Sequence, residues 1–233
     1  IDDTEIVALC DIHEDKVLEA QKKLKNFKRP EAKAFFGSEE AWRGMLDMDI
    51  DLIYITTSWR PHTLMSVEAM LSGKHVGVEV PAALTLEECW ALVDTSEKTG
   101  KHCMMLENCC YDFFELQTFN MVRQGVFGEL THAEGAYIHN LCPNISFSRE
   151  EGGKPWRFAQ NNSKNGNLYP THGLGPVAQC MNINRGNQFS YMVSMSSQEA
   201  AFTEWAERKG REQHAHLEHY RGDMNTSLIK CAK

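Results

Sequence analysis

The amino-acid sequence predicts an α/β protein: a Rossmann-like, doubly wound parallel sheet followed by an α+β domain with a mainly antiparallel sheet. In the first half, short runs that are apolar throughout alternate with segments of helical periodicity. Such strands, each followed by a helix, are typical of parallel sheets that are covered on both faces. After about residue 125 the strand candidates alternate apolar and polar residues, as half-exposed strands do. We therefore expect domains over residues 1–124 and 125–233.

Strands of the parallel sheet are expected wherever a buried apolar run occurs in the first half. These runs are, in order, 5–10, 32–36, 51–57, 75–80 and 102–108. Helical patterns fill the intervals, over 14–26, 38–46, 61–74 and 85–100. Ser38 can cap the second of these helices, and Pro61 suits the start of the third. Thr85 and Glu88 form a capping-box pattern at the start of the fourth, which ends at Gly100.

The second half contains fewer and longer strand signals. Residues 128–140 alternate in the manner of a half-exposed strand, and 189–197 and 224–232 are further strand candidates. A polar, charged stretch separates the last two. Residues 143–175 are rich in glycine and asparagine, so we expect a long loop there. The sheet of this domain is incomplete if its last strand has no further partners.

Composition excludes several classes of function. The 233 residues include 24 Lys+Arg and 32 Asp+Glu, which gives a formal net charge of −8. This charge, with no basic run, argues against nucleic acid and anionic lipid as partners. No apolar stretch reaches the roughly 18–20 residues needed to span a bilayer. The eight cysteines form no CxxC pair and several lie in apolar runs, so we expect reduced thiols that pack as small core residues.

Polar residues follow the predicted strands at the carboxyl edge of the parallel sheet. They are Asp11 after the first run, 56–58 after the third, Glu79 in the fourth, and 107–108 after the fifth. Ligands of open parallel sheets bind at the carboxyl ends of the strands. The sequence therefore predicts a ligand site at this edge.

Asp11 follows an apolar strand, where a dinucleotide-binding fold places the carboxylate that binds the adenosine ribose. The alternative is a cap for the helix that begins at residue 14, and both roles can hold together. The glycine-rich turn that normally lies about 20 residues upstream is not in the sequence, which begins with Ile1 directly before a strand signal. In the Rossmann strand order the first strand is central, and without it two neighbouring strands would keep unpaired backbone groups. We therefore expect this chain to be an internal segment of a longer protein.

Two sets of motifs resemble known families. The Asp-ended strand, the Thr-rich strand followed by Pro61-His62, and GKHVGVEVP (73–81) resemble the Gfo/Idh/MocA family of NAD(P)-dependent sugar oxidoreductases. Typical members carry Glu-Lys-Pro where this chain has Glu79-Val80-Pro81, and that lysine assists at the hydroxyl being oxidised. The chain resembles glycoside hydrolase family 109, the NAD-dependent α-N-acetylgalactosaminidases, more closely. The matching blocks are TTSWRPH, VEVPAALTLEECW, ENCCYDFFEL, GAYIHNL, NLYPTHGLGPVAQCMNINRG and RGDMNTSLIK.

This resemblance implies a redox-neutral glycosidase with NAD as its cofactor. The sugar is oxidised at C3, loss of the C2 proton expels the aglycone, water adds to the enone, and C3 is reduced again. NAD-dependent glycosidases are an exception to the usual scheme of two carboxylates flanking the scissile bond. The implied substrate is a glycan or small molecule that ends in α-linked N-acetylgalactosamine.

The resemblance also implies roles for individual residues. It places on NAD the residues Asp11, Trp59, Arg60, Pro61, His62, Glu79, Val80 and Asn108. It places on the sugar the residues Glu107, Tyr137, Arg157, Tyr169, Pro170, Thr171 and His172. On the residues alone, Pro61 is the first turn of a helix, Tyr137 is a core aromatic and Arg157 is a surface cation.

His172 and Tyr169 are the candidate catalytic pair. Histidine is the usual base near neutral pH, and a Tyr and a His three residues apart in a loop can direct two proton carriers into one cleft. An isolated histidine is more often structural, and the family block favours catalysis here. His172 can take its proton from the C3 hydroxyl or from C2, and Tyr169 can orient the sugar or act as the second acid/base.

Other interpretations stay open on the sequence alone. His214, His216 and His219 form an HxHxxH pattern, but their charged neighbours favour a solvated surface, and we expect no metal site. A sugar oxidoreductase that releases NADH is the second interpretation of function, which Glu-Val-Pro disfavours. A non-catalytic sugar-binding remnant is the third. Members of the family often carry export signals and pair through their sheets, so the resemblance is consistent with an exported homo-oligomer, and this sequence does not fix the compartment.

Overall fold

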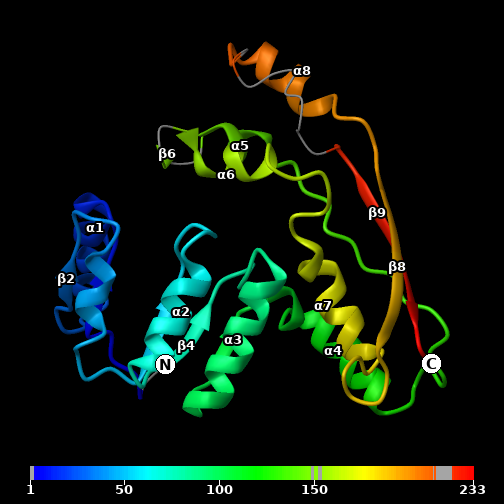
Figure 1. The fold of residues 1–233 in the computed structure, drawn as a ribbon, viewed down its shortest axis with the longest axis horizontal. Helices are drawn as coiled ribbons and strands as arrows, with labels where there is room; N and C mark the ends of the chain where they lie inside the picture. Colours follow the sequence, from blue (N-terminus) through cyan, green and yellow to red (C-terminus); the bar gives the residue numbers. More distant parts are fainter. Residues whose placement is uncertain (1–2, 148–149, 152–153, 212, 214–221) are drawn as a thin grey trace. The chain divides into compact units, whose positions relative to one another are not determined.

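The computed structural model describes residues 3–147, 150–151, 154–211, 213 and 222–233. The chain divides into two compact units, Ile1–Leu106 (unit 1) and Glu107–Lys233 (unit 2), and each is described by itself. Figure 1 labels their helices and several of their strands. None of the described helices is both long and apolar enough to cross a membrane. The domain boundary that we expect after residue 124 stays a prediction, since compact units and sequence domains need not coincide.

Unit 1 contains the predicted parallel strands. One sheet pairs β1 (Ala8–Cys10) with β2 (Lys33–Phe35). A second sheet has the order β3 (Leu52–Ile55), β4 (His75–Val78), β5 (Cys103–Met105), with every pairing parallel. Among the described residues no backbone pairing joins β1 to β3, so the parallel strands form two separate pieces.

The helices of unit 1 lie where the sequence predicts them. They are α1 (Glu14–Asn26), α2 (His62–Leu71) and α3 (Leu86–Thr99). The capping box of α3 is confirmed: the Thr85 side chain accepts the Glu88 backbone N–H, and the Glu88 side chain accepts the N–H of Thr85. Gly100 ends α3 in the left-handed conformation, with φ of 67°, which glycine adopts without steric cost.

The segment that begins at Ser38 forms a single 3₁₀ turn, η1 (Ala41–Met45), in place of the expected longer helix. The Ser38 hydroxyl accepts the backbone N–H of Glu40 at 3.3 Å, one residue before the turn. The segment 38–46 has too few apolar residues to support more than one turn, since short helices depend on packing of an apolar face.

The core of unit 1 lies between the three-stranded sheet and the helices α2 and α3. Its buried members are Ile55, Ala69, Met70, Val76, Val78 and Leu92. In Figure 1 the cyan α2 and the green α3 lie beside β4. This packing fixes the segments that follow β3 and β4, which carry the predicted cofactor contacts.

Unit 2 is more helical than the sequence predicts. Our expectation of a long loop over 143–175 is wrong, because helices and a short hairpin occupy most of it. The elements are η2 (Asn108–Cys110), α4 (Phe113–Arg123), α5 (Cys142–Phe147), β6 (Glu150–Glu151), β7 (Lys154–Pro155), α6 (Trp156–Asn161) and α7 (Pro170–Cys180). A small cluster of Ile145, Phe158 and Phe202 joins three short helices, so tertiary packing outweighs the weak helical propensity of the Gly- and Asn-rich sequence.

The two C-terminal strand predictions are confirmed. β8 (Phe189–Ser196) and β9 (Asn225–Cys231) pair as an antiparallel ribbon, and they run side by side in orange and red in Figure 1. The charged stretch between them contains α8 (Ala201–Arg208). Large apolar side chains are exposed on the ribbon, including Tyr191, Met192, Val193, Met195 and Leu228.

The expected strand over 128–140 is absent. These residues are mostly exposed, and they pair with no strand in the part of the chain that the structure describes. A regular strand needs a partner for its backbone groups, which alternation of side chains alone does not supply. The histidines at 214, 216 and 219 lie outside the described residues.

Candidate active site

Glu107 and His172 form a hydrogen-bonded pair within unit 2. Nδ1 of His172 lies 2.6 Å from Oε1 of Glu107, and the two side chains are 13% and 6% exposed. Because an ionised carboxylate can only accept hydrogen bonds, Nδ1 carries a proton, and in the neutral ring Nε2 is then the nitrogen with the lone pair. A carboxylate that fixes the tautomer in this way leaves Nε2 as a proton acceptor.

The turn at η2 fixes the carboxylate of Glu107. Oε1 also accepts the backbone N–H of Cys109 at 3.1 Å. Burial alone would raise the pKa of Glu107, but the nearby Thr171 hydroxyl, the His172 hydrogen bond and the Cys109 backbone together lower it below its ordinary value. The carboxylate is therefore ionised near neutral pH and stabilises the position of His172.

Two buried oxygens beside this pair have no hydrogen-bond partner in the described part of the chain. They are Oε2 of Glu107 and Oγ1 of Thr171. The Thr171 hydroxyl lies near enough to the Glu107 carboxylate to lower its pKa. Since unpaired buried polar atoms are costly, these oxygens suit the polar atoms of a ligand or of water.

Two tyrosine rings lie against His172. The rings of Tyr169 and His172 are stacked, with centroids 5.3 Å apart and planes 7° apart. The Tyr137 ring lies 4.7 Å from the His172 ring and 5.4 Å from the Tyr169 ring, measured between centroids. The Tyr137 hydroxyl lies 2.7 Å from Nδ1 of His139, which fixes the edge of the ring. Two tyrosine rings, each with a hydroxyl, therefore lie against one imidazole.

Arg157 connects the helix α6 to this group. Its Nη1 donates a hydrogen bond to the Tyr169 hydroxyl. Its guanidinium lies over the ring of Trp156, with Cζ 4.3 Å from the centroid, in the geometry of a cation–π contact. The guanidinium thus contacts both the Trp156 ring and the Tyr169 hydroxyl, and guanidinium groups are of a kind that binds sugar hydroxyls or an acetamide oxygen.

The sequence predicts a loop for Tyr169 and His172, but in the structure they lie at the start of a helix. Tyr169 directly precedes α7, and His172 is in the first turn of that helix. Pro170 occupies the first helical position, where proline is favoured because its missing N–H has no helical partner. The helix holds the two rings parallel, which a loop would do less rigidly.

A glycine contact brings Tyr137 to the pair. A Cβ on Gly173 would lie 2.8 Å from backbone atoms of residues 135–136, and a Cβ on Gly135 would lie 2.3 Å from the carbonyl oxygen of Gly173. Only glycine at both positions allows this approach of two backbones. The irregular segment that carries Tyr137 therefore packs directly on the first turn of α7.

A second glycine of α7 allows the approach of η2. A Cβ on Gly175 would lie 2.9 Å from Sγ of Cys110 and 3.3 Å from Cγ of Glu107. The glycine thus makes room for the Glu107 side chain beside the helix. The site is built from four separate segments that meet at the start of α7.

The cofactor contacts expected in unit 1 lie at the carboxyl ends of its strands. Asp11 follows β1, and its Oδ1 accepts the backbone N–H of His13 at 2.8 Å, just before α1. Glu79 follows β4, and its Oε1 accepts the Tyr54 hydroxyl at 2.9 Å. Burial and the Glu79 carboxylate raise the pKa of Tyr54, so that this phenol stays a donor. These two strand ends thus each present a carboxylate at the carboxyl edge of their sheet.

The other expected cofactor residues differ in their exposure. Arg60 is exposed, and Pro61 is half-buried directly before α2. The buried ones are Trp59, His62 and Val80. In unit 2, Asn108 is exposed at the start of η2, and Pro170 is exposed at the start of α7.

Glu107, Cys109 and His172 are also the kind of group that can hold a metal ion, since one ligand atom of each lies within 4.8 Å of the others. However, Nδ1 of His172 already donates to Glu107, and an ion would have to replace that bond. Burial and neighbouring carboxylates, Glu107 first, raise the pKa of the Cys109 thiol, which disfavours the thiolate that metals bind. The absence of a metal stays our prediction.

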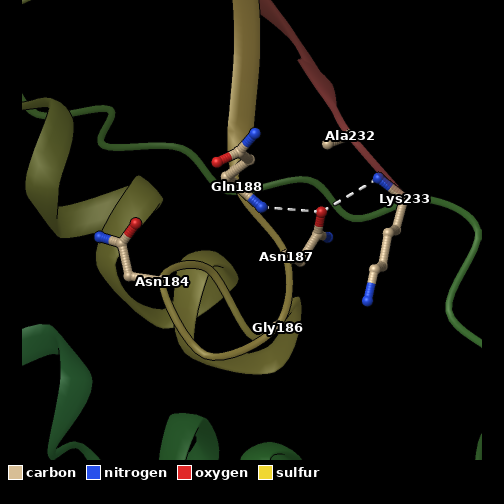
Figure 2. Close-up of a pocket in the computed structure, with 6 residues that line it drawn as sticks. All are labelled: Asn184, Gly186, Asn187, Gln188, Ala232 and Lys233. Carbon is tan, nitrogen blue, oxygen red and sulfur yellow. Dashed lines mark hydrogen bonds between the residues drawn. The ribbon is translucent and has the colours of Figure 1, made fainter.

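A pocket of about 350 Å³ lies elsewhere in unit 2. It is lined by Asn184, Gly186, Asn187, Gln188, Ala232 and Lys233, between the turn after α7 and the end of β9. Figure 2 shows that Oδ1 of Asn187 accepts the backbone N–H groups of Gln188 and Lys233, at 2.9 and 3.1 Å. None of the residues that line this pocket is a predicted site residue, and the Asn187 oxygen stabilises the turn itself.

Sequence reasoning missed several residues of the site. They are Gly135, Gly173 and Gly175, which allow the close approaches, together with Trp156 and His139, which hold Arg157 and Tyr137. The helical periodicity around two glycines in THGLGP is the signal that could have indicated a close helix contact. Nothing in the sequence indicates that residues 135 and 173 meet.

Comparisons with known proteins identify the families that the two halves of the chain match. Residues 111–233 match the glycosyl hydrolase 109 C-terminal domain, and residues 1–107 match the oxidoreductase family with an NAD-binding Rossmann fold. An alpha-N-acetylgalactosaminidase of Bacteroides fragilis is 50% identical over all of this chain. A glycosyl hydrolase family 109 protein of Phocaeicola vulgatus is 48% identical over 98% of it. The chain spans 56% of the length of each of these relatives.

Solved structures share the fold at low sequence identity. The WlbA dehydrogenase of Bordetella pertussis, solved with NADH and UDP-GlcNAcA, has a TM-score of 0.68 at 15% identity, over 98% of this chain and 60% of that one. Myo-inositol 2-dehydrogenase of Lactobacillus plantarum has a TM-score of 0.69 at 16% identity, over 98% and 59%. These likenesses establish the Rossmann-like fold with a following antiparallel sheet. The match over residues 111–233 establishes the family: this chain belongs to glycosyl hydrolase family 109.

Proposed function

We propose that the protein containing this chain is an NAD-dependent glycosidase that removes terminal α-linked N-acetylgalactosamine. The observation that carries the proposal is the buried pair of Glu107 and His172, 2.6 Å apart, with two tyrosine rings against the imidazole. Family membership and the name of the Bacteroides fragilis relative support the reaction and the sugar. A carboxylate-oriented imidazole is what a reaction needs when it must take up and return a proton near neutral pH.

The strand ends of unit 1 suit a dinucleotide by the chemistry of their side chains. Carboxylates at Asp11 and Glu79 can accept hydrogen bonds from ribose hydroxyls, as in other Rossmann folds. The match of residues 1–107 to the NAD-binding Rossmann family supports this assignment. When bound, NAD⁺ supplies a hydride acceptor for C3 of the sugar and the source of the hydride that restores it.

Within unit 2, His172 is the proton acceptor. In the neutral ring Nε2 has the lone pair, because Nδ1 donates to Glu107, and the ionised carboxylate stabilises the imidazolium that forms. Tyr169, stacked on the imidazole and bonded to Arg157, is the second proton carrier. The predicted sugar contacts Tyr137 and Arg157 orient the ring, and the unpaired oxygens of Glu107 and Thr171 suit its hydroxyls.

The alternative, a sugar oxidoreductase, lacks a specific observation in its favour. The Glu79-Val80-Pro81 sequence has no lysine to assist at a hydroxyl that is oxidised as the end of the reaction. The dehydrogenase structures that resemble this chain share its fold at 15–16% identity, which says nothing about the reaction.

The test is an assay of the complete natural protein on a chromogenic α-N-acetylgalactosaminide with NAD⁺. We expect release of the phenol without net formation of NADH, and loss of this activity in His172→Ala. Stoichiometric NADH without release of the phenol would instead establish a dehydrogenase. If the folded protein releases no phenol and forms no NADH, the sugar-binding remnant is the interpretation that remains.

A further inference from the structure

His62 connects two loops of unit 1 with both nitrogens of one ring. Nδ1 lies 2.7 Å from the carbonyl oxygen of Pro81, and Nε2 lies 3.1 Å from the carbonyl oxygen of Thr57. The side chain is 0% exposed. The two carbonyl groups belong to the segments that follow β4 and β3, which are neighbouring strands of one sheet.

Thr63 adds a second connection to the same loop. Its hydroxyl donates to the carbonyl oxygen of Ala82 at 3.1 Å, next to the carbonyl group that His62 contacts. Ser66 is fully buried one turn later and donates to the carbonyl oxygen of His62 at 2.7 Å. The first turn of α2 therefore contacts two successive carbonyl groups of the loop after β4, and its own backbone is fixed from within the helix.

The two connected loops are those that carry the expected cofactor residues of the sheet edge. Trp59 and Arg60 follow β3, and Glu79 and Val80 follow β4. A cofactor that contacts both loops requires a fixed distance between them, because binding loses affinity when the protein must first be ordered. A ring that is 0% exposed has no surface left for a ligand of its own.

We propose that His62, assisted by Thr63, is a positioning residue that fixes the spacing of these two loops for the dinucleotide and does not contact it. The inference rests on the proposed function for the identity of the ligand, NAD. A neutral imidazole has one N–H and donates to one carbonyl group at a time, whereas the doubly protonated ring donates to both. In either state an apolar ring at this position leaves buried carbonyl groups without a donor.

The test compares His62→Phe and Thr63→Val with a matched control, Thr99→Val, in the complete natural protein. Thr99 also donates its hydroxyl to a backbone carbonyl, that of Thr95 at 2.7 Å, but within α3. We measure the dissociation constant of NAD⁺ by calorimetry, and kcat and KM for NAD⁺ in the hydrolysis assay. Hydrogen exchange of the Glu79 backbone N–H, which donates to Ile55 at 3.0 Å, reports on the loop without any cofactor.

We expect His62→Phe to raise the dissociation constant by about tenfold or more and Thr63→Val by about threefold to tenfold, since each removes at least one net hydrogen bond from the loop. The loss of rate is recovered at saturating NAD⁺, which a general loss of folded protein would not allow. Exchange at Glu79 speeds up in both variants, and Thr99→Val matches the wild type in all three measurements.

Unchanged NAD⁺ affinity in a folded His62→Phe variant overturns the proposal. If that variant does not fold, Thr63→Val decides, and unchanged affinity in it also overturns the proposal. A wild type that binds NAD⁺ without hydrolysing the glycoside refutes the proposed function and leaves the positioning role intact. Hydrolysis of the glycoside by the wild type, together with an unaltered KM for NAD⁺ in both variants, supports the proposed function and overturns the positioning role.

Discussion

Replacing Glu107 with Gln removes the charge that holds His172 and changes as few other atoms as a substitution can. The glutamine amide can donate to Nδ1 of His172, which would move the ring proton to Nε2 and abolish its role as acceptor. A hydrogen bond to a charged group contributes about 1.5–3 kcal/mol, or roughly 10- to 150-fold in rate. The corresponding carboxylate-to-amide change in a serine protease triad costs about 10⁴ in kcat, because the tautomer is wrong.

We therefore expect Glu107→Gln to lower kcat by about 10–10⁴. The assay is hydrolysis of a chromogenic α-N-acetylgalactosaminide at saturating NAD⁺, with thermal unfolding as a check of the fold. Glu129→Gln is the matched control, since its carboxylate is exposed in the same unit. A Glu107→Gln variant that is folded and keeps kcat within about twofold would refute the orienting role of this carboxylate.

Three further predictions concern the same site. Gly173→Ala should lower activity, and also stability despite the roughly 1 kcal/mol better helix propensity of alanine, because its Cβ would lie 2.8 Å from the backbone of residues 135–136; higher stability with full activity would contradict the close contact. The folded pKa of Glu107 lies below its unfolded value, so its contribution to stability is complete above the unfolded pKa and is lost as the pH falls through the folded one; denaturant unfolding at a series of pH values should show this loss in the wild type and not in Glu107→Gln. Incubation with EDTA should leave activity unchanged, because in the one three-residue cluster found in the described part of the chain Glu107 and His172 bond to each other and the raised pKa of the Cys109 thiol disfavours a thiolate ligand; restoration of lost activity by a divalent ion would show a metal site instead.

Most of unit 1 could be predicted because its signals are local. Apolar runs and the Thr85–Glu88 capping box specify strands and helix starts within a few residues of sequence. The same is true of β8 and β9, whose alternating side chains are strong enough to indicate strands without knowledge of their partners.

The rest of unit 2 depends on contacts that are distant in the sequence. Residues 128–140 alternate like a strand, yet no described strand pairs with them, and residues 135–136 instead pack closely on Gly173. The helices in 143–175 form because they bury residues such as Phe158 against α8, which propensity does not reveal. The site residues could be named from the family blocks, but the pairing of Glu107 with His172, 65 residues apart, is visible only in the structure.

The central claim is that the glycosidic bond is broken by loss of the C2 proton, which His172 and its neighbours make possible. Hydrolysis by the complete natural protein in D₂O tests it most directly, with the position of deuterium in the released sugar read by NMR. The account predicts deuterium at C2, since the carbon is reprotonated from solvent after water adds. Released N-acetylgalactosamine with its original hydrogen at C2 would contradict it and indicate direct displacement at the anomeric carbon.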